Sequence, residues 1–193
     1  MKKIVAFLFV TFTLLQVSCN KDECKSVRYF NVTGLRMIPM AVDASQPNNP
    51  QYTTIYKNGS AKVEDFYLDG YLVADYYSRT TSSGFSFMPQ AYATDCASPG
   101  FDGSKESIAN ISFISRGNFN NYPPGSDIKN VIRINQKTVE EYLQDNANGI
   151  KDQYLIVTLT ERPDPSAMQA FTFILELQNG EIYKALTPGF YLK

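Results

Sequence analysis

Histidine and tryptophan are both absent from this 193-residue chain. Without histidine the chain cannot form a Ser-His-Asp triad, a Cys-His pair, a histidine-ligated zinc site or a haem held by a proximal histidine. Walker A, Gly-x-Gly-x-x-Gly, Cys-x-x-Cys, Gly-x-Ser-x-Gly and His-Glu-x-x-His motifs are missing as well. The sequence therefore predicts no metal site and no cofactor, and it leaves carboxylates as the main resource for acid–base chemistry.

Charge of either sign is also scarce. The chain carries 18 Lys and Arg against 19 Asp and Glu, so that its formal net charge is -1. A protein that binds nucleic acid needs a concentrated basic face to neutralise phosphates, and we expect no nucleic-acid partner. With 44% hydrophobic residues, the composition is typical of a globular domain and not of a disordered chain.

The N-terminus has the pattern of a bacterial secretory signal. Lys2 and Lys3 precede an uncharged run at 4–15, and Cys19 follows a small residue, Ser18. A membrane-spanning helix needs about 20 apolar residues, so this run is too short to cross a bilayer. Because Cys19 stands at the cleavage position, the segment resembles a lipoprotein signal, with acylation of Cys19 as the consequence. Simple secretion stays open as the alternative.

This interpretation divides the chain into a signal peptide at 1–18, a tether at 19–25 and one domain at 26–193. The tether contains Asn20 to Glu23, which resembles the Lys-acidic-acidic export signal of surface lipoproteins in Bacteroidetes; a plain charged tether is the alternative. We therefore expect an outer-membrane lipoprotein that contacts the membrane through its lipid anchor and faces the cell surface, or otherwise the periplasm.

If Cys19 carries lipid, two cysteines remain. Cys24 and Cys96 form an even pair in an oxidising compartment, and this predicts a disulfide between them. Two free buried thiols are the alternative. A catalytic role for either one is disfavoured because the chain has no histidine to lower a thiol pKa.

After the tether, runs of β-branched and aromatic residues alternate with turn residues, which indicates a mainly β fold. The strong hairpin signal is Asn179-Gly180 between the runs 171–178 and 181–186, and we also assign a type I′ hairpin to Asp69-Gly70 between 62–68 and 71–77. Gly34 predicts a bulge within one long strand at 26–40. Further strands are expected at 85–94 and 107–115, the latter central in its sheet, and a loop at 43–51. The pattern favours a single antiparallel β-sandwich, immunoglobulin-like or related.

One short α-helix is predicted near residues 138–147. Thr138 and Glu141 have the spacing of a capping box, in which each side chain bonds the other residue's backbone amide. Val139, Tyr142 and Leu143 form its apolar stripe, and Gly149 ends it.

Two segments, 107–128 and 171–188, are similar to small uncharacterised lipoproteins of Bacteroidetes that are described only as domains of unknown function. The first is a strand followed by an Asn/Phe-rich loop and a Pro-Gly turn, and the second is an extended hairpin that closes on Thr-Pro. With the Cys19 signal they cover about a third of the chain. The resemblance implies a β-sandwich on a lipid tether and transfers no catalytic residue.

Tyrosine is the residue type that points to a binding surface. Rigid aromatic rings with a polar tip suit recognition surfaces, although tyrosine also has high β-propensity and fills sheet faces and cores. The candidate positions are Tyr67, Tyr71, Tyr76, Tyr77, Phe119 and Tyr122. Tyr67 and Tyr71 are expected to share a sheet face, and the adjacent Tyr76 and Tyr77 to point to opposite faces.

We therefore expect a non-catalytic binding or accessory module with a protein or glycan ligand. The lack of tryptophan favours protein, because tryptophan is the strongest platform for stacking sugars. Two alternatives stay open. One is a glycosidase-like hydrolase that uses paired carboxylates from among Glu64, Asp65, Asp69 and Asp75; the other is a structural subunit of a surface complex.

Overall fold

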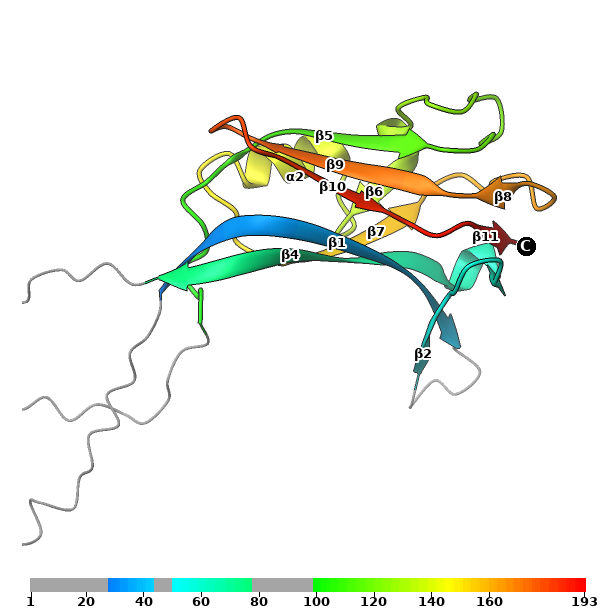
Figure 1. Ribbon diagram of the computed structural model, residues 1–193, viewed down its shortest axis with the longest axis horizontal. Helices are drawn as coiled ribbons and strands as arrows, with labels where there is room; N and C mark the ends of the chain where they lie inside the picture. Colours follow the sequence, from blue (N-terminus) through cyan, green and yellow to red (C-terminus); the bar gives the residue numbers. More distant parts are fainter. Residues whose placement is uncertain (1–27, 44–49, 78–98) are drawn as a thin grey trace, which may run out of the picture.

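The computed structural model describes residues 28–43, 50–77 and 99–193. In these residues two antiparallel sheets pack face to face, so the chain has the mainly β sandwich that its sequence predicts (Figure 1). The predicted signal peptide, the tether, all three cysteines and the strand expected at 85–94 lie outside the described residues.

The first sheet has five strands in the order β2, β1, β4, β7, β6, and the second has three in the order β10, β9, β5. Three short strands, β3, β11 and β8, form a third small sheet, in which β3 and β11 run parallel. The bounds are β1 Tyr29–Asp43, β2 Gln51–Thr54, β3 Ser60–Ala61, β4 Phe66–Tyr77, β5 Ile108–Ser115, β6 Ile132–Ile134, β7 Tyr154–Leu159, β8 Met168–Gln169, β9 Phe171–Leu177, β10 Ile182–Leu186 and β11 Phe190–Leu192. The helical elements are the 3-10 turns η1 Val63–Asp65 and η2 Lys129–Val131, and α2 Val139–Asp145.

The long first strand and its bulge are confirmed. β1 pairs with β4 along its length, and the register shifts between Val32 and Gly34. The extra residue bends β1, and in Figure 1 both β1 and β4 arch toward the second sheet. At the far end of this arch β2 pairs with β1 and projects away from the body, although the sequence was assigned a loop as far as Gln51.

The hairpin predicted at Asp69-Gly70 is wrong, because both residues lie inside the continuous strand β4. β4 is flanked by β1 and β7, and Gly70 is opposite Met37 on one side and Leu155 on the other. A Cβ at Gly70 would lie 2.6 Å from the Met37 sulfur and 2.8 Å from the Leu155 Cβ. The glycine thus permits close packing beneath the strand. An Asp-Gly pair alone does not tell this role from that of a hairpin turn.

The segment 107–115 forms β5 as expected, but it is an edge strand and not a central one. Its second edge is partly covered by irregular chain, because the amide of Ile128 donates to the carbonyl of Phe113 at 2.8 Å. β9 is the central strand of this sheet. The Asn179-Gly180 hairpin is confirmed, since β9 and β10 pair directly across it.

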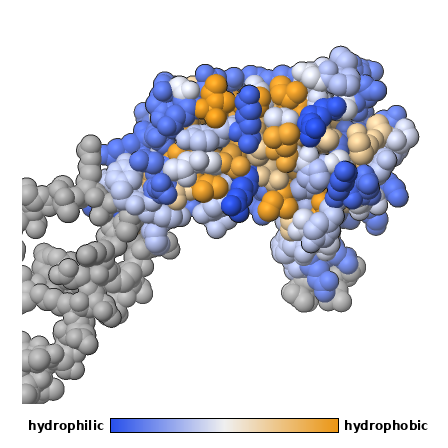
Figure 2. Space-filling view, in the orientation of Figure 1, coloured by the Kyte–Doolittle hydropathy of each residue, from blue (hydrophilic) through white to orange (hydrophobic). Residues whose placement is uncertain are grey.

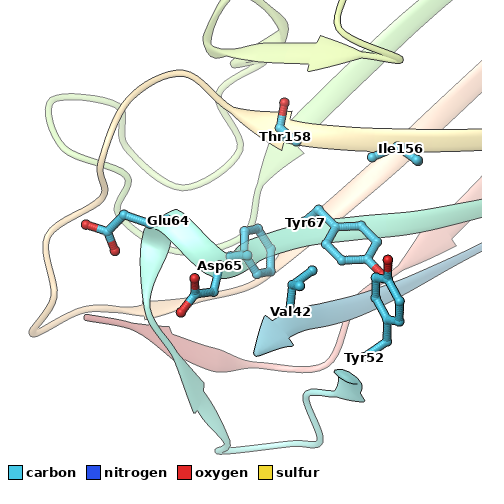
Figure 3. Close-up of a pocket in the computed structure, with 8 residues that line it drawn as sticks. Val42, Tyr52, Glu64, Asp65, Tyr67, Ile156 and Thr158 are labelled. Carbon is cyan, nitrogen blue, oxygen red and sulfur yellow. The ribbon is translucent and has the colours of Figure 1, made fainter. Parts of the chain in front are cut away.

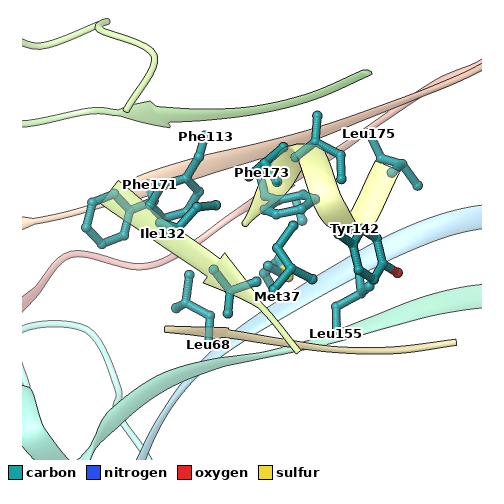
Figure 4. Packing of buried hydrophobic residues seen from close by; sticks show 14 of the residues in the cluster. Met37, Leu68, Phe113, Ile132, Tyr142, Leu155, Phe171, Phe173 and Leu175 are labelled. Carbon is teal, nitrogen blue, oxygen red and sulfur yellow. The ribbon is translucent and has the colours of Figure 1, made fainter. Parts of the chain in front are cut away.

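The predicted helix is confirmed as α2, with both bonds of the capping box between Thr138 and Glu141 present. It packs against β5 and β6, which belong to different sheets, and so covers one side of the sandwich. In Figure 4 its Tyr142 lies beside Leu155 of the first sheet and Leu175 of the second.

The core lies between the two sheets and is rich in phenylalanine and aliphatic residues (Figure 4). Phe113, Phe171 and Phe173 of the second sheet face Met37, Leu68 and Leu155 of the first. The Phe113 and Phe171 rings stack with their centroids 4.7 Å apart. These alternating buried positions leave the intervening residues of each strand on the outside of the sandwich.

Candidate functional site

The outer face of the five-stranded sheet carries a continuous set of aromatic and aliphatic side chains. Directly opposed residues of antiparallel strands point to the same side, so the pairing defines which residues share it. Tyr71 is opposite Arg36 and Tyr154, Asp69 is opposite Ile38 and Ile156, Tyr67 is opposite Met40, and Val42 is opposite Tyr52. We call this surface the tyrosine face; its residues are Arg36, Ile38, Met40, Val42, Tyr52, Thr54, Tyr67, Asp69, Tyr71, Arg133, Tyr154, Ile156 and Thr158.

Several large side chains of this face are open to solvent. Tyr154 is 63% exposed, Tyr52 62%, Ile156 49% and Ile38 41%. They come from β1, β2 and β7, while Tyr67 and Tyr71 of the intervening strand β4 are half-buried between them. The exposed residues are therefore parts of one apolar surface and not isolated positions.

The rings of the face support one another. Tyr71 and Tyr154 lie 5.2 Å apart between centroids, and Tyr52 meets Tyr67 edge to face at 6.5 Å. Such ring pairs hold their members in fixed orientations. A surface of restrained rings loses little conformational freedom when a partner covers it.

An open hollow of about 420 Å³ lies at the β2 end of the face. In Figure 3 Tyr52, Tyr67 and Val42 gather on one side of it, and the carboxylates of Glu64 and Asp65 point away from these rings. Tyr52 of β2 lines one side of it, and Figure 2 shows this end of the molecule projecting beyond the body of the sandwich. The hollow gives the tyrosine face a concave end.

Tyrosine pKa values on this face are raised. Burial, followed by the charge of Asp69 and the neighbouring Tyr52, raises the pKa of Tyr67. The Tyr76 hydroxyl, followed by burial, raises the pKa of Tyr71. Because the ordinary tyrosine pKa is already near 10, these hydroxyls stay protonated at neutral pH and serve as hydrogen-bond donors rather than as bases.

The candidate tyrosines predicted from the sequence fall into different environments. Tyr67 and Tyr71 share the tyrosine face as expected, although they lie on one strand and not on two arms of a hairpin. The hydroxyl of Tyr76 lies close to that of Tyr71, because Tyr71 and Tyr76 both donate to the Gln153 side-chain oxygen, at 3.2 and 2.9 Å. Tyr77 is half-buried and stacks on Tyr29 at 5.7 Å.

Phe119 and Tyr122 do not belong to this surface, which corrects the expectation for both. Phe119 is fully buried and packs against Phe171 of β9 with centroids 6.1 Å apart. Tyr122 is partly buried against Phe119, and its hydroxyl accepts a bond from Asn130 at 3.2 Å. The loop's two backbone bonds between Phe119 and Tyr122 turn both rings toward the core, and composition alone could not reveal this.

Sequence reasoning missed Ile38, Tyr52, Tyr154 and Ile156, which are the exposed hydrophobic members of the face. In β7 the run Tyr154–Leu159 is apolar at almost every position, so alternation does not tell the inner residues from the outer ones. Tyr52 was missed because β2 follows a Pro/Asn-rich segment and was not predicted as a strand. The aromatic and β-branched run at 52–56 is the signal that could have identified this strand.

The four acids considered for hydrolysis differ in location and in bonding partners. Glu64 forms an ion pair with Arg162, and Asp65 lies beside it in η1. Asp69 lies on the tyrosine face, and Asp75 is exposed near the end of β4. Within the described ranges, no cluster of three or more Cys, Asp or Glu residues is arranged to hold a metal ion.

The outer face of the three-stranded sheet differs from the tyrosine face. Its members, which we call the β10 face, are Asn110, Ser112, Ile114, Thr172, Ile174, Glu176, Ile182, Lys184 and Leu186. Ile182 and Leu186 are 54% and 59% exposed, but no aromatic ring lies among these positions. This face supplies matched control positions for the experiments below.

No helix in the part of the chain that the structure describes is long and apolar enough to cross a membrane. Comparison of the chain with protein-family models, with curated proteins and with solved structures gave no match. The function must therefore be argued from the residues and their geometry alone.

Proposed function

We propose that the protein is a non-catalytic binding module on a lipid anchor, and that its tyrosine face contacts a protein partner. The observation that carries this proposal is the exposure of Tyr52, Tyr154, Ile38 and Ile156 on one sheet face that no other described element covers. Contiguous apolar surface of this kind is uncommon on a monomeric protein unless something binds there. Tyrosine is also among the residues that contribute most to protein interfaces.

The composition of the face favours a protein over a glycan. Its central row is Ile38, Asp69 and Ile156, so aliphatic side chains occupy the middle of the surface. Branched aliphatic groups gain energy when they pack against other apolar side chains, but they offer neither hydrogen bonds nor a flat ring to a sugar. A protein partner can offer apolar side chains to Ile38 and Ile156 and a polar group to Asp69 in the same row.

The proposal is tested with a photo-crosslinking residue, p-benzoylphenylalanine, placed in turn at Tyr52, Ile156 and Leu186 in producing cells. We expect discrete adducts of one protein from positions 52 and 156 on the tyrosine face, and none from position 186 on the β10 face. Ile156→Asp should abolish the adduct formed from position 52. Equal adducts from position 186, or none from the tyrosine face, would overturn the proposal.

The lipid anchor is proposed from the sequence around Cys19. Two or three acyl chains hold a protein on a bilayer far more firmly than one, so the binding face would stay at the membrane surface. Labelling of cells with an alkynyl palmitate analogue should mark the wild-type chain and not Cys19→Ser. Protease added to intact cells should degrade the chain if it faces the surface; protection would assign it to the periplasmic side.

The disulfide between Cys24 and Cys96 is likewise a proposal. Described residues close to both cysteines in sequence are bonded to each other: Arg28 pairs with Asp102 at 2.7 Å, and the Asp102 amide donates to the Arg28 carbonyl at 2.8 Å. These bonds join the start of β1 to the 99–103 segment. A bridge closing a loop of about 70 residues contributes roughly 4 kcal/mol in chain-entropy models. Non-reducing peptide mapping should find the linked pair; two free thiols would contradict it.

A further inference from the structure

One carboxylate stands alone in the middle of the tyrosine face. Asp69 is half-buried and lies between Ile38 and Ile156 across the strands, with Tyr67 and Tyr71 two residues away on either side along β4. It accepts no hydrogen bond and forms no ion pair with any residue of 28–43, 50–77 or 99–193.

Several other acids of the described ranges have structural uses. Asp102 pairs with Arg28 at 2.7 Å, Glu106 accepts from the amide of Val32 at 3.0 Å, and Glu141 caps α2. None of these tasks applies to Asp69, which holds no turn, cap or neighbouring strand through its side chain. An aspartate is also a poor residue for the middle of a strand, so its place in β4 is not explained by the fold.

A partner that covers the face must remove water from Asp69. Leaving a carboxylate buried without a counter-charge is strongly unfavourable, and a purely apolar partner would therefore be rejected. A cation brought to this point would restore the lost interaction and fix the register of the complex. The described part of the face holds two cations, Arg36 opposite Tyr71 and Arg133 opposite Thr158, and neither forms an ion pair with Asp69.

The flanking tyrosines favour an arginine over a lysine as the cation that pairs with Asp69. A guanidinium is planar and weakly hydrated, and it stacks on aromatic rings while it pairs with a carboxylate; an ammonium group is compact and strongly hydrated. Building on the proposed function, we propose that the tyrosine face is a receptor for an arginine side chain of the partner protein, with Asp69 as its counter-ion and Tyr67 and Tyr71 beside it. Aliphatic residues next to that arginine would pack on Ile38 and Ile156.

The test selects a random peptide library displayed on phage against the full chain, purified in detergent as cells produce it. We expect the recovered peptides to share an arginine flanked by apolar residues. Asp69→Asn should weaken their binding at least about tenfold, and replacement of the peptide arginine by alanine should cause the same loss. Combining the two changes should add little, because both remove one interaction.

Two further variants separate the possible outcomes. Glu176→Gln on the β10 face neutralises a half-buried carboxylate between Ile182 and Asn110, and it should leave binding unchanged. Ile156→Ser removes apolar contact at the tyrosine face and should weaken binding. Thermal unfolding confirms that each variant is folded.

The arginine assignment is overturned if Ile156→Ser weakens binding but Asp69→Asn does not, or if no arginine is enriched; the proposed function then stands. If neither Ile156→Ser nor Asp69→Asn affects the recovered peptides, the binding face itself is refuted. A selection that returns no peptide, or recognition of a glycan by the same face in a glycan array, also counts against the arginine receptor.

Discussion

The two outer faces of the sandwich have similar aliphatic exposure and different aromatic content. Ile182 and Leu186 on the β10 face, at 54% and 59%, are more exposed than Ile38 and Ile156 on the tyrosine face, at 41% and 49%. Exposed aliphatic residues are common on soluble proteins and indicate little by themselves. The tyrosine face adds four tyrosines from three strands and a concave end. The proposed binding surface therefore differs from the β10 face in its arrangement of tyrosine rings and not in its exposed aliphatic residues.

The largest effect is expected where the tyrosine face depends on the packing beneath it. Gly70→Ala would place a Cβ 2.6 Å from the Met37 sulfur and 2.9 Å from the Leu155 carbonyl, so β4 would have to shift. Overpacking of this kind costs about 3 kcal/mol of unfolding free energy, measured by urea denaturation. It would also separate the rings of the face.

Gly34→Ala is the matched control, because its new Cβ would meet only the Val73 side chain, at 3.3 Å. We expect a cost well below that of Gly70→Ala. Equal losses in the two variants would contradict the account of Gly70 as a packing residue.

Gly70 also shows where sequence reasoning reaches its limit. Sequence signals that depend only on neighbouring residues gave correct predictions. These are the capping box at Thr138, the bulge at Gly34 and the Asn179-Gly180 turn. Asp69-Gly70 has two meanings, a turn or a close approach of strands, and the choice depends on β7, which is more than 80 residues away in the chain. The same is true of the tyrosine face, whose members are joined by pairing between distant strands.

A smaller effect is expected at the contact that links β10 to the first sheet. The Tyr183 hydroxyl lies 2.8 Å from both the Val32 carbonyl and the Glu181 carboxylate. Tyr183→Phe removes these bonds and should lower the unfolding free energy by about 1 kcal/mol. Tyr191→Phe, at a half-buried tyrosine whose hydroxyl makes no bond within the described ranges, should change it less. A larger loss in Tyr191→Phe would contradict the role of the link.

The same hydroxyl predicts a pH dependence. Burial, followed by the bond to Glu181, raises the pKa of Tyr183 to about 12. The folded chain therefore holds this proton more tightly than the unfolded chain, whose tyrosines titrate near 10. The contribution is fully present below pH 10 and is lost as the pH rises through about 12. The unfolding free energy, measured between pH 10 and about pH 12, should fall less steeply with pH for Tyr183→Phe than for the wild type. Parallel curves for the two proteins would contradict this pH dependence.

The smallest effect on stability is expected at the exposed aliphatic residues themselves, and it sharpens the comparison of the faces most. Ile156 and Leu186 are 49% and 59% exposed, so replacing either with serine removes little buried apolar surface. Both variants should unfold within about 0.5 kcal/mol of the wild type. Only Ile156→Ser should weaken crosslinking from position 52, because Leu186 lies on the face without aromatic rings. If Leu186→Ser weakened it equally, exposed aliphatic residues and not the tyrosine arrangement would define the site.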